Sequence, residues 1–167
     1  SDASGRPYPG TVNQPEGALP LIVSTERTIS RTTTVSAAVF HGVRTGEDPR
    51  FTTMWTILGD PKFSVAVPCW ASMETVADEL TDPRGAELGE IAVTLRDWNL
   101  TVDRTGIHTK GLPGIWKDVL PAEQAMVAEA LSMRESWVGN SVTPADMTTF
   151  HHSMAGRAMH VMNQELL

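Results

Sequence analysis

The stretch TTMWTILGDPKFSVAVP, residues 52–68, decides the fold class of this chain. It contains two apolar segments separated by Gly-Asp-Pro at 59–61. The segments are rich in Thr, Trp, Ile and Val, which are typical of strands, whereas Gly-Asp-Pro favours a turn. The sequence therefore predicts one strand over 51–58 and another over 63–67, which is closed by Pro68.

A further strand is predicted upstream, over 33–43. Its apolar residues fall on both alternating faces: Val35, Ala37, Val39 and Val43 on one, Ala38 and Phe40 on the other. The connection over 44–50 suits an antiparallel pair with the next strand. A strand that is apolar on both faces needs neighbours on its faces and along its edges. The sequence therefore predicts that part of this sheet comes from residues further upstream.

After Trp70 the apolar residues recur every three or four positions, which is typical of helices. One predicted helix carries Leu88, Ile91, Ala92, Leu95 and Trp98 on a single face. A second begins at Pro121, carries a stripe that ends with Trp137, and stops at Gly139-Asn140. A third begins at Pro144, after Thr143 as the N-cap and with Asp146 as its third residue, and runs nearly to the end.

Strands followed by helices indicate an α+β architecture. The predicted regions are a Pro- and Gly-rich lead-in over 1–20, antiparallel strands over 21–70, and a helical region over 71–167 that packs on the sheet.

The composition excludes several classes of function. The net charge is −7 and no run of Lys or Arg is present, so nucleic acid is excluded as a main partner. No apolar run approaches the roughly 20 residues of a membrane-spanning helix. The single cysteine, Cys69, excludes an internal disulfide and leaves the cellular compartment open, with a secreted or periplasmic location favoured. No Gly-rich phosphate loop is present, and no cofactor is predicted.

Residues 29–40, ISRTTTVSAAVF, together with 52–68, resemble the carboxyl-terminal portion of linear-amide hydrolases. This group includes acyl-coenzyme A:isopenicillin N acyltransferase and, more distantly, the choloylglycine hydrolases. The resemblance covers about 20–70 and is most specific in Thr-Thr-Met-Trp at 52–55. It implies that the α+β elements are part of an αββα sandwich of an N-terminal nucleophile hydrolase, made as a precursor that cleaves itself.

In that family an N-terminal cysteine attacks the amide carbonyl, and its own α-amino group acts as the base. The resemblance implies that this nucleophile lies upstream of the matched segment. The chain would then be the C-terminal part of an amide-bond hydrolase or acyltransferase, active with an upstream segment or subunit as its partner.

The resemblance also implies a position for Arg31 at the mouth of the active site, near the nucleophile. A guanidinium there would hold a substrate carboxylate or orient the attacking group, and Thr32 and Thr33 would support it. The alternative for Arg31 is a solvated arginine at the start of a strand. Threonines at such a place also need no function.

Other candidate residues are interpreted structurally. Ser1 precedes a Pro-rich segment that cannot begin a packed strand, and Cys69 is expected to be a small buried residue. His151, His152 and His160 are not expected to bind a metal, because His152 and His160 lie about 12 Å apart along a helix, too far to be two ligands of one ion. His41 is either a buried polar residue or faces a pocket. The tryptophans at 98, 116 and 137 are expected in the core or in an interface that covers the missing half.

A second hypothesis is a secreted structural or self-assembling protein that keeps the hydrolase-derived fold without catalysis. The absent nucleophile and the open edges of the sheet would serve a filament or a homo-oligomer equally well.

Overall fold

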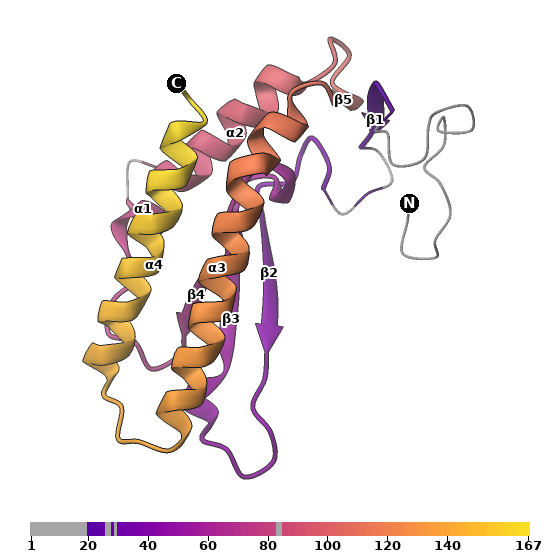
Figure 1. Ribbon diagram of the computed structural model, residues 1–167. Coiled ribbons are helices and arrows are strands. Elements are labelled where there is room, and N and C mark those ends of the chain that lie inside the picture. The colour runs from indigo at the N-terminus through magenta and orange to yellow at the C-terminus, as the bar shows by residue number, and fades with distance from the viewer. Residues whose placement is uncertain (1–19, 26–27, 29, 83–84) are drawn as a thin grey trace.

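Figure 1 shows the computed structural model, which describes residues 20–25, 28, 30–82 and 85–167. The predicted lead-in lies outside the described residues except for Pro20. Both sheets are antiparallel, one of three strands and one of two. The elements are β1 Ile22–Ser24, β2 Ser36–His41, η1 Pro49–Phe51, β3 Thr53–Leu58, η2 Pro61–Phe63, β4 Val67–Trp70, α1 Asp78–Thr81, α2 Glu87–Asn99, β5 Gly106–His108, α3 Leu112–Val138 and α4 Pro144–Gln164.

The predicted antiparallel pair is confirmed in the three-stranded sheet, whose order is β2-β3-β4. β2 is shorter at both ends than the predicted strand over 33–43, because a turn precedes it and a loop follows it. β3 begins at Thr53 because the 3-10 turn η1 occupies the residues before it. The loop after β2 is tied to α3, since Arg134 donates to Glu47 Oε2 at 2.7 Å and to the Phe51 carbonyl at 3.1 Å.

The prediction of a strand over 63–67 that Pro68 closes is wrong. The turn η2 occupies 61–63, and Pro68 lies inside β4 opposite Trp55. Proline is tolerated there because β4 is an edge strand of its sheet, where an N–H that faces away from the neighbouring strand is not needed. The Pro68 carbonyl also faces away from the sheet and is bonded to His151 Nδ1 of α4 at 2.8 Å.

Of the two helix starts that the sequence predicts, the one at Pro144 is confirmed and the one at Pro121 is not. In α2 the residues predicted to share one face are buried except Trp98, which is 63% exposed. Trp98 is therefore not part of the core, and its alternative place in an interface stays a prediction. In α4 the Thr143 and Asp146 capping box is present as predicted. The predicted start at Pro121 is wrong, because α3 begins at Leu112 and accommodates Pro121 in its interior. The strand β5 also interrupts the region after Trp70 that was predicted to be entirely helical.

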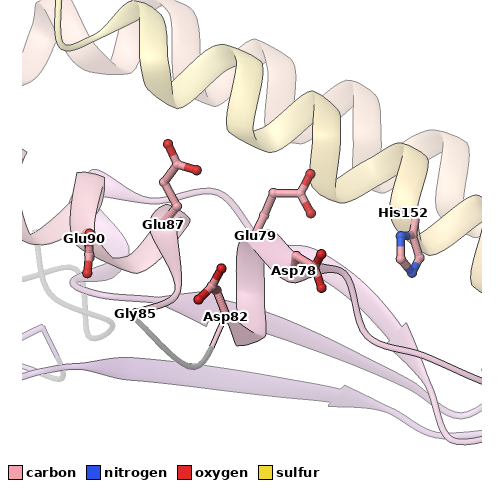
Figure 2. Close-up of a pocket in the computed structure, with 7 residues that line it drawn as sticks. All are labelled: Asp78, Glu79, Asp82, Gly85, Glu87, Glu90 and His152. Carbon is pink, nitrogen blue, oxygen red and sulfur yellow. The ribbon is translucent and has the colours of Figure 1, made fainter.

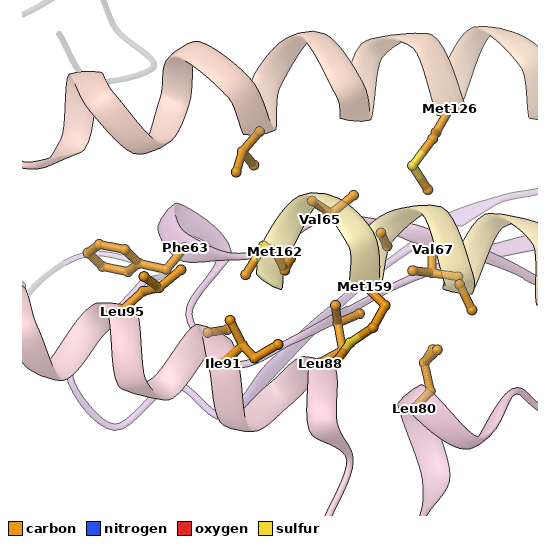
Figure 3. Close-up of a cluster of buried hydrophobic side chains, with 14 of the residues drawn as sticks. Phe63, Val65, Val67, Leu80, Leu88, Ile91, Leu95, Met126, Met159 and Met162 are labelled. Carbon is orange, nitrogen blue, oxygen red and sulfur yellow. The ribbon is translucent and has the colours of Figure 1, made fainter. Parts of the chain in front are cut away.

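The core covers both faces of β3 and β4. Figure 3 shows the larger cluster, in which Val65 and Val67 pack with Leu88, Ile91 and Leu95 of α2 and with methionines of α3 and α4. The second cluster contains Trp55 and Trp70 from the opposite face. Its rings pack closely: the centroids of Trp70 and Trp137 are 5.0 Å apart in a T-shaped arrangement.

β2 differs from its neighbours because its side chains are open to solvent. Val39 and Phe40 are 57% and 70% exposed, and Val35, just before the strand, is 73% exposed. Val39 lies opposite Trp55 and Phe40 opposite Met54, so the exposed side chains belong to both faces of the sheet. The described residues therefore leave uncovered a strand whose two faces were predicted to need cover. None of the described helices is long and apolar enough to span a membrane.

Candidate functional site

The predicted site residues Arg31, Thr32 and Thr33 lie together on the turn that leads into β2. The Thr34 N–H donates to the Arg31 carbonyl at 3.0 Å, and the Arg31 N–H donates to Thr34 Oγ1 at 2.8 Å. Arg31 Nε donates to the Thr28 carbonyl at 3.2 Å, and the arginine is exposed. Thr33 is exposed and Thr32 is half-buried. The turn thus brings the three residues together at the surface, and their part in catalysis stays a prediction.

The side chains of Lys62 and Arg96 bond to the two ends of this turn. Lys62 of η2 donates from Nζ to the Ser30 carbonyl at 2.9 Å and also bonds to Ser30 Oγ. Arg96 of α2, which is 6% exposed, donates to the Thr34 carbonyl at 3.5 Å and to Asp97 Oδ1 at 2.9 Å. Ser30 and Thr34 stand on either side of the predicted site residues, so elements distant in sequence set the position of the turn.

Asp60 completes this arrangement. Its side chain is fully buried, and Oδ1 accepts from the Lys62 N–H at 3.0 Å and from the Ser30 hydroxyl. Oδ2 lies 3.1 Å from Lys62 Nζ, an ion pair in which the lysine side chain is 21% exposed. Burial lowers the pKa of Lys62, the Asp60 carboxylate opposes this effect, and Arg96 adds to it. We call Ser30, Asp60, Lys62 and Arg96 the anchor cluster.

The sequence interpretation missed the anchor cluster. It treated Gly-Asp-Pro at 59–61 only as a turn signal. Asp60 is the N-cap of η2, and Asp followed by proline is a readable signal for such a cap, but not for burial of the carboxylate. Its pairing with Ser30 spans thirty residues of sequence, and no spacing rule links the two positions.

The anchor cluster has the geometry of a structural support rather than of a nucleophile and its base. The Ser30 hydroxyl donates to the Asp60 carboxylate and accepts from the Lys62 ammonium. A serine nucleophile needs an unprotonated base that is basic enough to take its proton, and a carboxylate is only weakly basic. Here the lysine is paired with a carboxylate, so the contacts orient Ser30 and do not activate it.

Cys69 and His151 lie side by side, but their arrangement is also structural. Cys69 Sγ is 3.8 Å from His151 Nδ1. That nitrogen donates to the Pro68 carbonyl at 2.8 Å, and Nε2 accepts from the Ala77 N–H at 3.0 Å, so both ring nitrogens are in use. Burial raises the pKa of the Cys69 thiol and lowers the pKa of His151, which favours both neutral forms. The prediction that Cys69 is a buried residue is confirmed.

The remaining histidines and tryptophans occupy varied positions. His41 is exposed on β2, so its interpretation as a buried residue is wrong. His152 bonds to Thr75 Oγ1 at 3.1 Å and His160 to Gln164 Nε2 at 3.2 Å, both at the surface. Within the described parts of the chain no group of three His, Cys, Asp or Glu residues could hold a metal ion. Trp137 is in the core, and Trp116 Nε1 donates to the Lys62 carbonyl at 2.9 Å.

A separate hollow of about 550 Å³ is strongly acidic. Figure 2 shows carboxylates from α1 and the start of α2 around it, and His152 from α4 at its side. The lining residues are Asp78, Glu79, Asp82, Gly85, Glu87, Glu90 and His152. Such a surface repels a substrate carboxylate. This hollow is therefore a poor candidate for the carboxylate-binding site that the resemblance implies for Arg31.

These elements define an α+β protein with antiparallel sheets, in which one open edge strand follows an exposed, anchored arginine turn. Comparison of the chain with family models, with curated proteins and with solved structures finds no match. An architecture of this kind hosts many activities, so a functional conclusion has to come from particular residues.

Proposed function

We propose that this chain is the C-terminal part of an amide-bond hydrolase or acyltransferase of the N-terminal nucleophile type. The nucleophile belongs to an upstream segment or subunit, and the complete sheet forms an αββα sandwich. The observation that carries the proposal is the open edge at β2, where Val39 and Phe40 are 57% and 70% exposed on opposite faces.

An isolated edge strand normally carries charges, proline or a bulge that prevents pairing with another chain. The residues of β2 are Ser-Ala-Ala-Val-Phe-His, which include none of these except a histidine at the end. A strand that is apolar on both faces is typical of the inside of a layered sheet. The edge of β2 therefore supports a neighbouring strand from another segment, with further layers over Val39 and Phe40.

The exposure of Arg31 supports a role for it in such a complete site. Its turn leads directly into β2, and the guanidinium is exposed. Arginine binds a carboxylate through two parallel hydrogen bonds, and it remains charged at any physiological pH. In the proposed reaction this chain contributes binding and orientation, while the other segment provides the attacking group. Cys69 is not that group, because it is buried and burial raises its pKa.

The proposal is tested on the native preparation, by intact mass and N-terminal sequencing together with turnover of N-acyl amino acids. We expect a second polypeptide that begins with Cys, Ser or Thr, and hydrolysis or transfer of the acyl group. A homogeneous single polypeptide without amide turnover contradicts the proposal.

The open edge equally favours the second candidate, a self-assembling protein without catalysis. Light scattering and electron microscopy of the same preparation distinguish the two. Regular particles made of this chain alone, with no turnover, support the assembly protein.

Arg31→Ala in the complete protein tests the site directly. We expect kcat/KM for a carboxylate-bearing amide to fall by roughly tenfold or more, since a hydrogen bond to a charged group contributes about 1.5–3 kcal/mol. The matched control is Arg157→Ala, which removes a partly exposed arginine of α4. Unchanged turnover in Arg31→Ala removes Arg31 from the site.

A further inference from the structure

We infer that Lys62 and Asp60 are positioning residues that hold the Ser30–Thr34 turn, so that the Arg31 guanidinium is presented at the surface just before the start of β2. This inference rests on the proposed function and extends it to residues that do not touch the substrate. Three features of the anchor cluster support it.

The first feature is the direction of the Lys62 side chain. Its ammonium contacts the Ser30 carbonyl and hydroxyl, and these atoms lie thirty-two residues away in sequence. The turn η2 does not need this lysine side chain, because the Asp60 cap uses the Lys62 backbone N–H. The lysine therefore connects η2 to the Arg31 turn rather than stabilising η2 itself.

The second feature is the burial of the charges. Asp60 is fully buried and the Lys62 side chain is 21% exposed, although removing charges from water is unfavourable. A buried ion pair contributes little net stability, but breaking it leaves one charge unpaired. Such a pair restricts the movement of both side chains, since separating them would leave a buried charge unpaired at a large cost in free energy. The two groups thus restrict Ser30, the residue next to Arg31.

The third feature is that the same turn is held at its other end. Arg96 donates to the Thr34 carbonyl, and Trp116 Nε1 donates to the Lys62 carbonyl at 2.9 Å, which fixes η2 against α3. The turn is therefore braced by α2 and, through η2, by α3. The residues on both sides of Arg31 are thus tied to packed elements, while the Arg31 side chain itself is exposed.

The test uses the complete native protein and the variants Lys62→Met, Lys62→Arg and Ser30→Ala. Met keeps the length and the apolar stem of lysine, while Arg keeps the charge. The control is Lys117→Met, which changes an exposed lysine of α3. For each variant, kcat and KM are measured for a carboxylate-bearing N-acyl amino acid and for its carboxylate-free analogue. Hydrogen exchange of the peptide over 30–36 and phenylglyoxal modification of Arg31 are followed by mass spectrometry.

We expect Lys62→Met to raise KM for the carboxylate-bearing substrate by roughly tenfold, with a much smaller effect on the analogue. Exchange in 30–36 becomes faster and Arg31 reacts faster with phenylglyoxal. Lys62→Arg restores much of the selectivity, and Ser30→Ala changes it in the same direction as Lys62→Met without removing a charge. Lys117→Met behaves as the wild type.

Three outcomes overturn the inference: unchanged exchange and KM in Lys62→Met and Ser30→Ala, an equal loss on both substrates, or loss of melting temperature without loss of selectivity. Failure of the proposed function has a different signature. In that case the wild type turns over neither substrate, while the exchange and modification data still decide whether the anchor cluster holds the turn.

Discussion

At the scale of single residues, His151 shows how the fold uses a histidine without catalysis. One ring nitrogen donates to the Pro68 carbonyl and the other accepts from the Ala77 N–H. The ring thereby joins α4 to β4 and to the segment before α1, and it satisfies two backbone groups in a buried place. Protonation would give Nε2 a hydrogen that points at the Ala77 N–H, so the neutral ring is required.

This requirement predicts a pH dependence of stability. Burial lowers the pKa of His151 in the folded state below the ordinary value of 6.5. As the pH falls below about 6.5, His151 binds a proton in the unfolded chain but stays neutral in the folded chain. The free energy of unfolding therefore decreases until the pH reaches the pKa of His151 in the folded state. Urea unfolding between pH 5 and pH 8 measures this slope.

His151→Gln is expected to have a smaller loss of stability on acidification than the wild type, because the titrating ring is absent. It is also expected to be less stable at pH 8, by about 1–3 kcal/mol, since the geometry of two buried hydrogen bonds changes. The control His160→Gln alters an exposed histidine of the same helix. An identical slope in His151→Gln and the wild type would show that this ring does not titrate with unfolding.

At the scale of elements, Gly59 determines how β3 turns towards η2 and α2. Its φ of +79° is in the left-handed region, and an added Cβ would lie 2.5 Å from Ala92 Cβ. Gly46 has a similar φ of +90°, but an added Cβ there meets nothing within 4 Å. The two glycines therefore separate the backbone effect from the packing effect.

We predict that Gly46→Ala destabilises the fold by about 1–2 kcal/mol, the cost of the left-handed conformation alone. Gly59→Ala should destabilise the fold by about 1–3 kcal/mol more than Gly46→Ala does, because α2 must shift to admit the methyl group. Thermal and urea unfolding measure both. The double variant Gly59→Ala with Ala92→Gly removes the close contact and should recover most of the difference, and no recovery would refute the contact as its cause.

At the scale of the whole molecule, the main feature is the contrast between covered and uncovered strands. Helices and loops cover both faces of β3 and β4, whereas β2 is exposed. Phe40→Lys should change the free energy of unfolding by less than about 0.5 kcal/mol, because the Phe40 ring is largely exposed and is not part of the core. It should nevertheless weaken association with the partner segment, since a lysine resists burial at an interface.

Co-purification and size-exclusion chromatography of the complete protein measure that association. Val102→Lys, at a loop position that is fully exposed, is the matched control and should leave association unchanged. Equal association by Phe40→Lys and the wild type would mean that β2 is not the contact surface.

Local rules predicted much of the secondary structure. The antiparallel pairing of β2 with β3, most of α2 and the start of α4 followed from alternation, helical periodicity and the Thr143 capping box. The same rules failed at Pro68 and Pro121, because whether a proline ends an element depends on what faces its nitrogen. The short pair of β1 with β5 was also missed, since it joins segments about eighty residues apart.

The candidate site also combines residues that the sequence indicated with residues that it did not. The sequence alone drew attention to Arg31, Thr32 and Thr33, through a resemblance whose functional meaning stays a prediction. Asp60, Lys62 and Arg96 became visible only in three dimensions, where they meet the turn beneath these residues.

The sequence by itself determined the α+β class, the antiparallel pairing of β2 with β3 and the Thr143 cap of α4, because each depends on residues that are close together along the chain. The tertiary structure alone decided which strand remains open, which prolines are tolerated and which charges hold the Arg31 turn. These features depend on burial and on contacts between distant segments, and neither quantity is encoded in the spacing of residues along the chain.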